Sequence, residues 1–183
     1  MLITTVKPPL PVDWPDADAG RSLPEHRLLL TPFRYPPLVN GSRFSAADTR
    51  ELFYAARSLA TVLAERAFHA LRLLEGSPLP EGRCIHRQQT SFSVQIHTER
   101  GLRLQHGIQA FEVPSARVPQ EAPCVGVLTP YAFGSTPFDF QDWTLEVRAD
   151  GVTFASFGQS QVVSLPREQF LVAGRWPGPE PKA

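Results

Sequence analysis

Three polar side chains are spaced so that they could share one face of a helix and take part in proton transfer. Glu65, His69 and Arg72 follow one another at intervals of four and three residues. A histidine with a pKa near 6.5 can act as a base at neutral pH, although that value does not require the role. The same spacing also fits a solvated pair of Glu65 with His69 or Arg72, which is the usual state of helix glutamates.

A second group of reactive residues surrounds Cys84, which lies beside Arg83, His86 and Arg87. Neighbouring positive charge lowers the pKa of a thiol and favours its reactivity. Cys84 and His86 alone are too few ligands for a zinc site, and the five histidines are scattered with no third ligand nearby. The sequence therefore predicts no metal site. The other cysteine, Cys124, lies in an apolar run and is expected to be a small buried residue.

Composition and missing motifs exclude several classes of function. There is no Walker loop, GxGxxG, HExxH or GxSxG motif. Eighteen basic residues balance eighteen acidic ones, so we expect neither direct nucleic-acid binding nor an anionic membrane as partner. No long apolar segment is present, and the first residues do not resemble a signal peptide. We therefore expect a cytoplasmic protein.

The clearest predicted element is a helix that positions Glu65. Ser58 is a plausible N-cap, apolar residues follow at helical spacing, and Gly76 and Pro78 end the pattern. The apolar stripe of this helix should pack on a sheet.

The rest of the chain is richer in strand patterns. Residues 28–35 contain an apolar run that predicts a strand, and the period changes to two after residue 85. Residues 124–128 read as a strand buried on both faces, and Asp150–Gly151 is a two-residue hairpin signal. The other expected strands are 91–97, 108–113, 143–147, 152–157, QVVSL and QFLVA.

These elements predict a single α+β domain, with a mixed or antiparallel sheet and one main helix packed on it. Residues 1–27 are rich in Pro, Asp and Ala and read as an irregular N-terminal arm. The folded domain is expected over residues 28–175, followed by a disordered tail over residues 176–183.

Two blocks of sequence resemble the RES family, which is named for an Arg, a Glu and a Ser. The first block holds Arg34, the Gly41–Ser42–Arg43–Phe44 step, the Phe53–Tyr54–Ala55–Ala56 strand and Glu65, eleven residues after Tyr54. The second block, GIQAFEVPSARVPQEAPCVGVLTPYAF, supplies the matching Ser115. One departure is that only residues 98–107 separate the TSFSVQI strand from the second block, where family members usually have a helix.

The resemblance implies an ADP-ribosyltransferase-like fold and a cleft that binds NAD as substrate, with no metal. Arg34 and Arg43 would bind its two phosphates, because a guanidinium fork suits phosphate oxygens. Glu65 would stabilise positive charge on the ribose as the nicotinamide bond breaks. Tyr54 would stack on the nicotinamide or bond its amide, and Ser115 would bond the nicotinamide, a ribose hydroxyl or a phosphate. Glu65, Tyr54 and Arg43 are the implied catalytic residues.

The implied function is phosphorolysis or hydrolysis of NAD, by the toxin of a toxin–antitoxin pair whose partner is a helix-turn-helix antitoxin. Two alternatives stay open: a protein ADP-ribosyltransferase that uses the same residues, and a degenerate, non-catalytic interaction module. The sequence also leaves open a homo-oligomer.

Overall fold

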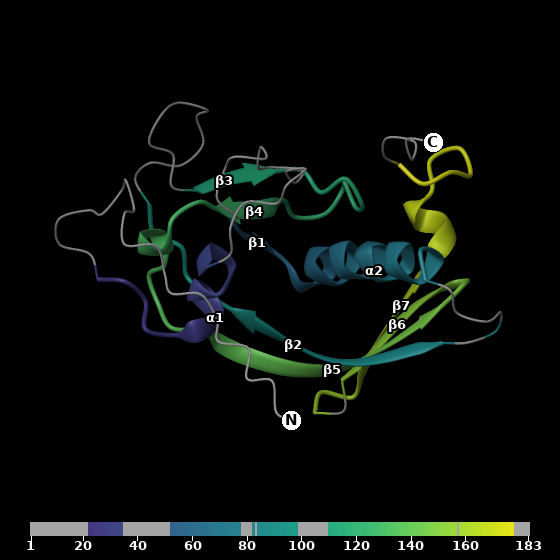
Figure 1. Cartoon of the computed structure of the whole chain (residues 1–183), viewed down its shortest axis with the longest axis horizontal. Helices are drawn as coiled ribbons and strands as arrows, with labels where there is room; N and C mark the ends of the chain where they lie inside the picture. Colours follow the sequence, from purple (N-terminus) through teal and green to yellow (C-terminus); the bar gives the residue numbers. More distant parts are fainter. Residues whose placement is uncertain are drawn as a thin grey trace, which may run out of the picture. The chain divides into compact units, whose positions relative to one another are not determined.

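The computed structural model describes residues 22–34, 52–77, 82, 84–98, 110–156 and 158–177. The chain forms two compact units (Figure 1). The first takes residues 1–55, 93–113 and 124–138, and the second takes residues 56–92, 114–123 and 139–183. Because these stretches alternate along the chain, neither unit is a separable domain, and the predicted single α+β domain is confirmed.

The first unit is built around a small sheet. Its strands β1 (Phe53–Ala56), β3 (Ala110–Val113) and β4 (Cys124–Val127) lie in the order β1–β4–β3. Strands β3 and β4 are antiparallel, with Ala110 opposite Val127 and Val113 opposite Cys124. All four residues of β4 are buried, which confirms the strand predicted to be covered on both faces. The unit also contains α1 (Arg27–Leu30) and two 3-10 helices, η1 (Pro32–Arg34) and η2 (Pro130–Ala132).

Aromatic rings fill the core of this unit. The ring of Phe133 meets the edges of Phe53 and Phe33, with centroids 5.1 and 6.3 Å apart. Edge-to-face packing of this kind adds about 0.5–1.5 kcal/mol to the burial of apolar area. Phe33, Phe53 and Phe133 therefore belong to the core of this unit.

The strand predicted over residues 28–35 is wrong, because the described part of this segment is helical. The side chain of His26 accepts from the backbone N–H of Leu28 at the start of α1. Thr31 closes the turn with its N–H and its hydroxyl, which both donate to the Arg27 carbonyl oxygen. Local capping by side chains thus outweighs the apolar run that suggested a strand.

The second unit consists of one long helix and a larger sheet. The helix α2 (Leu59–Glu75) packs on a four-stranded sheet of order β2–β5–β6–β7. The strands are β2 (Ile85–Ser93), β5 (Phe138–Arg148), β6 (Gly151–Ser156) and β7 (Gln161–Pro166). Strand β6 is antiparallel to both β5 and β7. Two sheets thus stand where the sequence predicted one.

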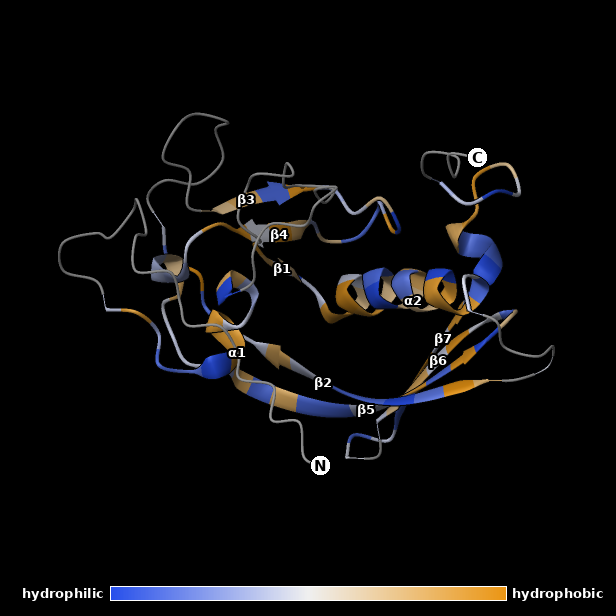
Figure 2. Ribbon diagram, viewed as in Figure 1, coloured by the Kyte–Doolittle hydropathy of each residue, from blue (hydrophilic) through white to orange (hydrophobic). Residues whose placement is uncertain are grey.

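The predicted helix is confirmed at both ends. The Ser58 hydroxyl accepts from the N–H of Thr61 at 3.2 Å, as an N-cap does. At the other end, the N–H of Gly76 donates to the Arg72 carbonyl oxygen at 3.2 Å. Both hydrophobic and hydrophilic residues line the helix (Figure 2), and its apolar stripe joins the core together with residues from the sheet. The buried members of that core are Leu63, Ala64, Ala67, Phe68, Ala70, Leu71, Trp143, Leu145, Val147, Val152, Phe154 and Phe170.

The end of the folded region differs from the prediction. The sequence QFLVA was expected as a strand, but Arg167–Phe170 form the 3-10 helix η3. Strand β7 ends at Pro166, which has no N–H for a further ladder bond. Trp176 was expected in a disordered tail, yet it packs against Phe68 with ring centroids 5.5 Å apart. Residues 178–183 of that predicted tail lie outside the described residues, as do residues 1–21 of the predicted arm.

The predicted hairpin between β5 and β6 forms with its turn one residue earlier. Arg148 is paired with Gly151, so Ala149 and Asp150 make the turn and Gly151 belongs to β6. A Cβ atom at position 151 would lie 2.8 Å from the Leu165 carbonyl oxygen. The glycine is therefore explained by the close approach of β7 rather than by the turn.

Among the described residues, no helix is both long and apolar enough to cross a membrane.

Replacing Gly126 by Ala should destabilise the protein, because a Cβ atom there would lie 2.6 Å from Cε1 of Phe111 and closer still to Cζ. We expect a loss of about 1–3 kcal/mol in the free energy of unfolding, measured by urea denaturation. Gly158→Ala is the matched control, since no atom lies within 4 Å of its Cβ position. Adding Phe111→Leu to Gly126→Ala should recover part of the loss, and equal effects of the two glycine substitutions would contradict this account.

Candidate active site

Glu65 is the centre of the candidate site, and it is buried. It lies on α2 among buried neighbours, and only 7 % of the residue is exposed. Arg72 does not pair with it, because the Arg72 guanidinium binds Glu75 at 3.0 Å. The interpretation of Glu65 as a solvated helix glutamate is therefore wrong. A carboxylate taken out of water needs hydrogen bonds or charge to replace its hydration.

Ser115 supplies the shortest of the contacts described for this carboxylate. Its hydroxyl donates to Oε1 of Glu65 at 2.7 Å, and both residues are buried. The same hydroxyl oxygen accepts from the backbone N–H groups of Arg117 and Val118, at 3.1 and 3.3 Å. A serine hydroxyl has one proton to donate, so that proton is committed to Glu65. The arrangement fixes the direction in which the carboxylate points.

Residues 114–123, here called the Ser115 loop, follow α2 along one face. The N–H of Arg57 donates to the Pro123 carbonyl oxygen at 3.0 Å, and the Thr61 hydroxyl donates to the Ala122 carbonyl oxygen at 2.8 Å. The hydrogen bond from the Ser115 hydroxyl to Glu65 is a third contact between this loop and the segment that contains the helix. Thr61 and Glu65 are four residues apart on α2, so the helix presents them on one side, as residues four apart lie one above the other.

Arg117 adds a positive charge to the site. Its Nε lies 3.9 Å from Oε2 of Glu65, and its side chain is 13 % exposed. The guanidinium carbon also lies 3.3 Å from the ring centroid of Phe68, on the next turn of α2. Desolvated contacts between a cation and an aromatic face are worth about 2 kcal/mol. Phe68 therefore holds the guanidinium beside the carboxylate.

His69 follows Phe68 on α2 and lies at the surface. Burial of part of its ring lowers the pKa of His69 below 6.5, and the charges of Arg117 and Arg66 act in the same direction. The carboxylate of Glu65 acts against this and raises the pKa. The ring packs edge-on against Phe68, with centroids 5.6 Å apart.

The structure brings together two of the five predicted site residues, Glu65 and Ser115. Arg34 lies on η1 and is half-buried, while Tyr54 lies on β1 and is 37 % exposed. Both belong to the first unit. Arg43 lies outside the described residues.

The residue that sequence reasoning missed is Arg117. The available signal is the Ser-x-Arg step from Ser115 to Arg117, directly after Pro114, where a serine is also a common turn residue. Nothing in the sequence shows that Phe68, on a distant segment, covers this guanidinium.

The chemistry available here is electrostatic. A buried carboxylate that is oriented by a hydroxyl can stabilise positive charge that develops on a bound molecule. Among the described residues, one group could hold a metal ion, namely Cys84, His86 and Glu146. None of these three contacts Glu65 or Ser115 in the hydrogen bonds and ion pairs described above.

Comparison with known protein families gives one match. A family model described as the RES domain matches residues 19–156, which includes α2, the Ser115 loop and all five predicted site residues. No curated protein matches the chain. The α+β class observed here is consistent with the ADP-ribosyltransferase-like fold that the resemblance implies.

Ser115→Ala should lower the stability of the folded chain. The substitution removes a donor from a buried carboxylate and an acceptor from two backbone N–H groups. We expect a loss of about 2–3 kcal/mol in the free energy of unfolding, measured with urea. Ser164→Ala removes an exposed serine whose hydroxyl bonds only Thr153 in the contacts described, and it should change stability by less than about 0.5 kcal/mol. A loss as small in Ser115→Ala would show that the hydroxyl does not support Glu65.

The ring of His69 should titrate below pH 6.5, and Glu65→Gln should lower its pKa further, because the carboxylate raises it. Two-dimensional NMR of the histidine rings measures the His69 pKa in the wild type and in Glu65→Gln. The signal of His69 is identified by its loss in His69→Gln. Since the folded chain binds this proton less tightly than the unfolded chain does, its contribution to stability is complete above pH 6.5 and is lost as the pH falls through the folded pKa. A His69 pKa at or above 6.5, or one that ignores Glu65→Gln, would contradict the arrangement.

Proposed function

Because the chain belongs to the RES domain family, we propose that it is an enzyme that consumes NAD by breaking the bond between nicotinamide and ribose. The observation that carries the proposal is the buried carboxylate of Glu65, held at 2.7 Å by the Ser115 hydroxyl. Burying an oriented carboxylate lowers the free energy of unfolding unless its lost hydration is replaced. A role in stabilising a positively charged transition state explains why the chain keeps a carboxylate at this position.

The chemistry requires a negative charge near the ribose. As the carbon–nitrogen bond breaks, nicotinamide leaves as a neutral molecule and the ribose ring acquires the character of an oxocarbenium ion. A carboxylate ~4 Å away, at an effective dielectric constant near 20, attracts that charge by about 4 kcal/mol. This corresponds to a rate increase of roughly a thousandfold. Glu65 is the residue to which we assign this role.

The other residues of the family pattern bind and orient the substrate. Arg34 and Arg43 are proposed to bind the two phosphates, where a fixed guanidinium fork gives paired hydrogen bonds. Tyr54, more than a third exposed on β1, is proposed to contact the nicotinamide. Ser115 is proposed to act through Glu65 as a positioning residue, since its proton is already donated to that carboxylate.

The fate of the ribose carbon defines the reaction. Attack by an oxygen of inorganic phosphate gives a phosphorylated ADP-ribose, and attack by water gives ADP-ribose and releases a proton. Either reaction depletes NAD. We propose that the chain acts in this way as the toxin of a toxin–antitoxin pair in the cytoplasm, and that the partner is a helix-turn-helix protein.

Glu65→Gln should reduce the rate of NAD consumption about a thousandfold, because it removes the charge and keeps the shape of the side chain. Purified protein is incubated with NAD, with and without phosphate, and the products are separated by chromatography. Glu75→Gln is the matched control, since Glu75 is an exposed carboxylate on the same helix that pairs with Arg72 and Arg167. It should retain full activity.

Further arms of this experiment separate the roles and the alternatives. Arg34→Gln and Arg43→Gln should raise KM more than they lower kcat if these residues bind the phosphates in the ground state. Label transferred to a protein with little free ADP-ribose would indicate the protein ADP-ribosyltransferase instead. Intact NAD in every sample, with normal growth of cells that express the chain, would indicate the non-catalytic module and refute the proposal.

A further inference from the structure

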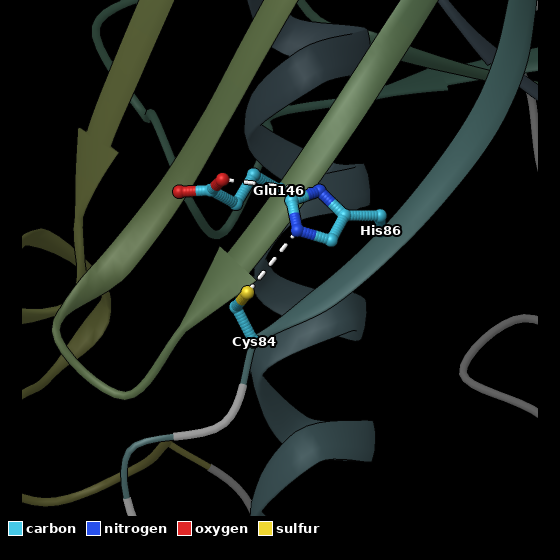
Figure 3. A group of neighbouring side chains, drawn as sticks. All are labelled: Cys84, His86 and Glu146. Atoms are coloured by element: carbon cyan, nitrogen blue, oxygen red, sulfur yellow. Dashed lines mark hydrogen bonds and ion pairs between the residues drawn. The ribbon is translucent and has the colours of Figure 1, made fainter.

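The face of the four-stranded sheet opposite α2 holds a second group of chemically reactive side chains, where β2 begins and β5 ends. Cys84, His86 and Glu146 converge there (Figure 3). The Cys84 sulfur lies 3.1 Å from Nε2 of His86, and Nδ1 of His86 lies 3.8 Å from a carboxylate oxygen of Glu146. One donor atom from each of the three residues lies within 4.8 Å of the other two.

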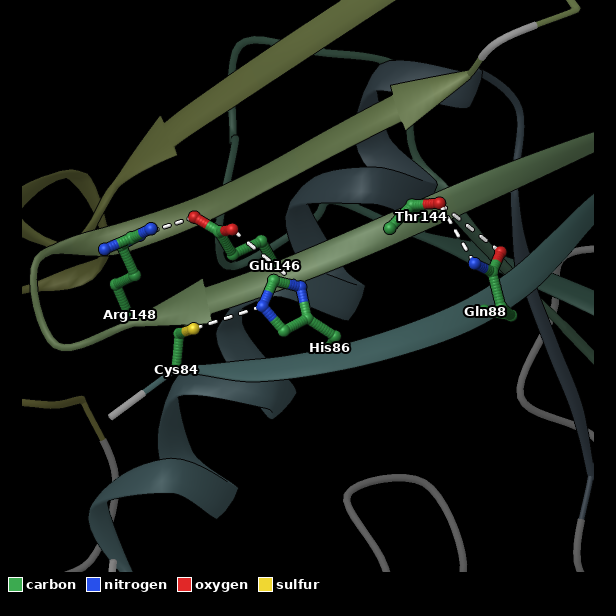
Figure 4. A network of polar contacts seen from close by, with 6 residues as sticks. All are labelled: Cys84, His86, Gln88, Thr144, Glu146 and Arg148. Atoms are coloured by element: carbon green, nitrogen blue, oxygen red, sulfur yellow. Dashed lines mark hydrogen bonds and ion pairs between the residues drawn. The ribbon is translucent and has the colours of Figure 1, made fainter. Parts of the chain in front are cut away.

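The strands account for this convergence. Cys84 directly precedes β2 and His86 is the second residue of that strand, and residues two apart share one face of an extended chain. Glu146 lies on β5 between Leu145 and Val147, which are both buried in the core beneath α2. Its side chain must therefore point to the opposite face. Gln88 and Thr144 are joined by hydrogen bonds on the same face (Figure 4), and they hold the two strands in this register.

We propose that Cys84, His86 and Glu146 form a binding site for a zinc ion, with water as the fourth ligand. Thiolate, imidazole and carboxylate are the three donor types that Zn²⁺ accepts in proteins, and three protein ligands with one open position give a tetrahedral site. Zinc–ligand distances of ~2.0–2.3 Å would bring the donor atoms ~3.3–3.7 Å apart. Because Cys84 faces one ring nitrogen of His86 and Glu146 faces the other, binding requires these side chains to rotate, and all three are at least partly exposed.

Neighbouring groups favour the carboxylate as a ligand. Arg148 binds one carboxylate oxygen of Glu146, while the other oxygen is the one nearest His86. A hydrogen bond to the outer oxygen of a ligating carboxylate fixes its direction, as the partners of metal ligands do. The side chain of Arg148 is 58 % exposed, so solvent screens its charge from the metal.

The sequence alone could not show this site, since Cys84 and His86 lack a third ligand nearby in the chain. The fold supplies that ligand from β5, about sixty residues later. Binding would replace the thiol proton of Cys84 by the metal and release that proton to solvent, so affinity should fall in acid. The ion would join the start of β2 to the end of β5. The proposal stands independently of NAD consumption, because none of the three residues belongs to the candidate active site.

The test uses the full chain without a histidine tag, in a non-thiol reductant. Zinc is titrated into the protein in competition with a chromophoric chelator, and cobalt is titrated in parallel. We expect one equivalent of tightly bound zinc, and a thiolate-to-cobalt charge-transfer band in the near ultraviolet. Cys84→Ser and His86→Ala should each weaken zinc binding by about a hundredfold or more, and Glu146→Gln by about tenfold or more, given that even outer partners of ligands contribute ~10–100-fold.

Asp142→Asn is the matched control. Asp142 is an exposed carboxylate four residues before Glu146 on the same strand, where it accepts from Thr90 at 2.7 Å. It should bind zinc as the wild type does, and circular dichroism should show that all four variants are folded. Absence of stoichiometric zinc binding, a cobalt complex without the thiolate band, or binding that survives all three ligand substitutions would each overturn the proposal.

Discussion

Burial of the Glu65 carboxylate costs several kcal/mol unless hydrogen bonds and charge replace the water it has lost. In this chain the compensation comes from the Ser115 loop, which provides the Ser115 hydroxyl at 2.7 Å and the Arg117 guanidinium at 3.9 Å. Other residues of the second unit hold the loop and the guanidinium in place. Phe68 covers the guanidinium, and the carbonyl oxygens of Ala122 and Pro123 bind the loop to the first turn of α2 and to Arg57. If the carboxylate were removed, Arg117 would be left among apolar neighbours with less to balance its charge.

The four-stranded sheet has two different faces, and both follow from the alternation of β5. Trp143, Leu145 and Val147 point toward α2 and join the core. Thr144 and Glu146, between them, contact polar side chains of β2 on the other face. One period-two strand therefore supports the helix that carries Glu65 and also positions the ligands of the proposed zinc site. The apolar layer between helix and sheet separates the Glu65 group from the Cys84–His86–Glu146 group. A substitution in one group therefore alters no direct contact of the other.

Local signals in the sequence were sufficient for the elements that they govern. Ser58, the apolar stripe and Gly76 specify α2 to the residue, and the apolar run at 124–128 predicts the buried strand that forms over Cys124–Val127. The prediction failed at two segments, for different reasons. Residues 28–34 are helical because His26 and Thr31 satisfy the backbone locally, which the apolar run did not reveal. Trp176 packs on a distant core that a proline-rich ending gave no reason to expect. Glu65 and Ser115 were predicted as site residues through the family resemblance, whereas the burial of Glu65 and the roles of Arg117 and Glu146 required the fold.

The alternation of the two units along the chain has a consequence for synthesis on the ribosome. The apolar stripe of α2 is complete at residue 75, but the strand that contacts it in the core, β6, ends at residue 156. At ~5–20 residues per second, that interval lasts ~4–16 s, which is long compared with helix formation. During those seconds the apolar residues of the new helix stay exposed, because the strand that will cover them has not yet been made. A chain with this order of segments should depend on chaperones during translation more than one whose units are continuous.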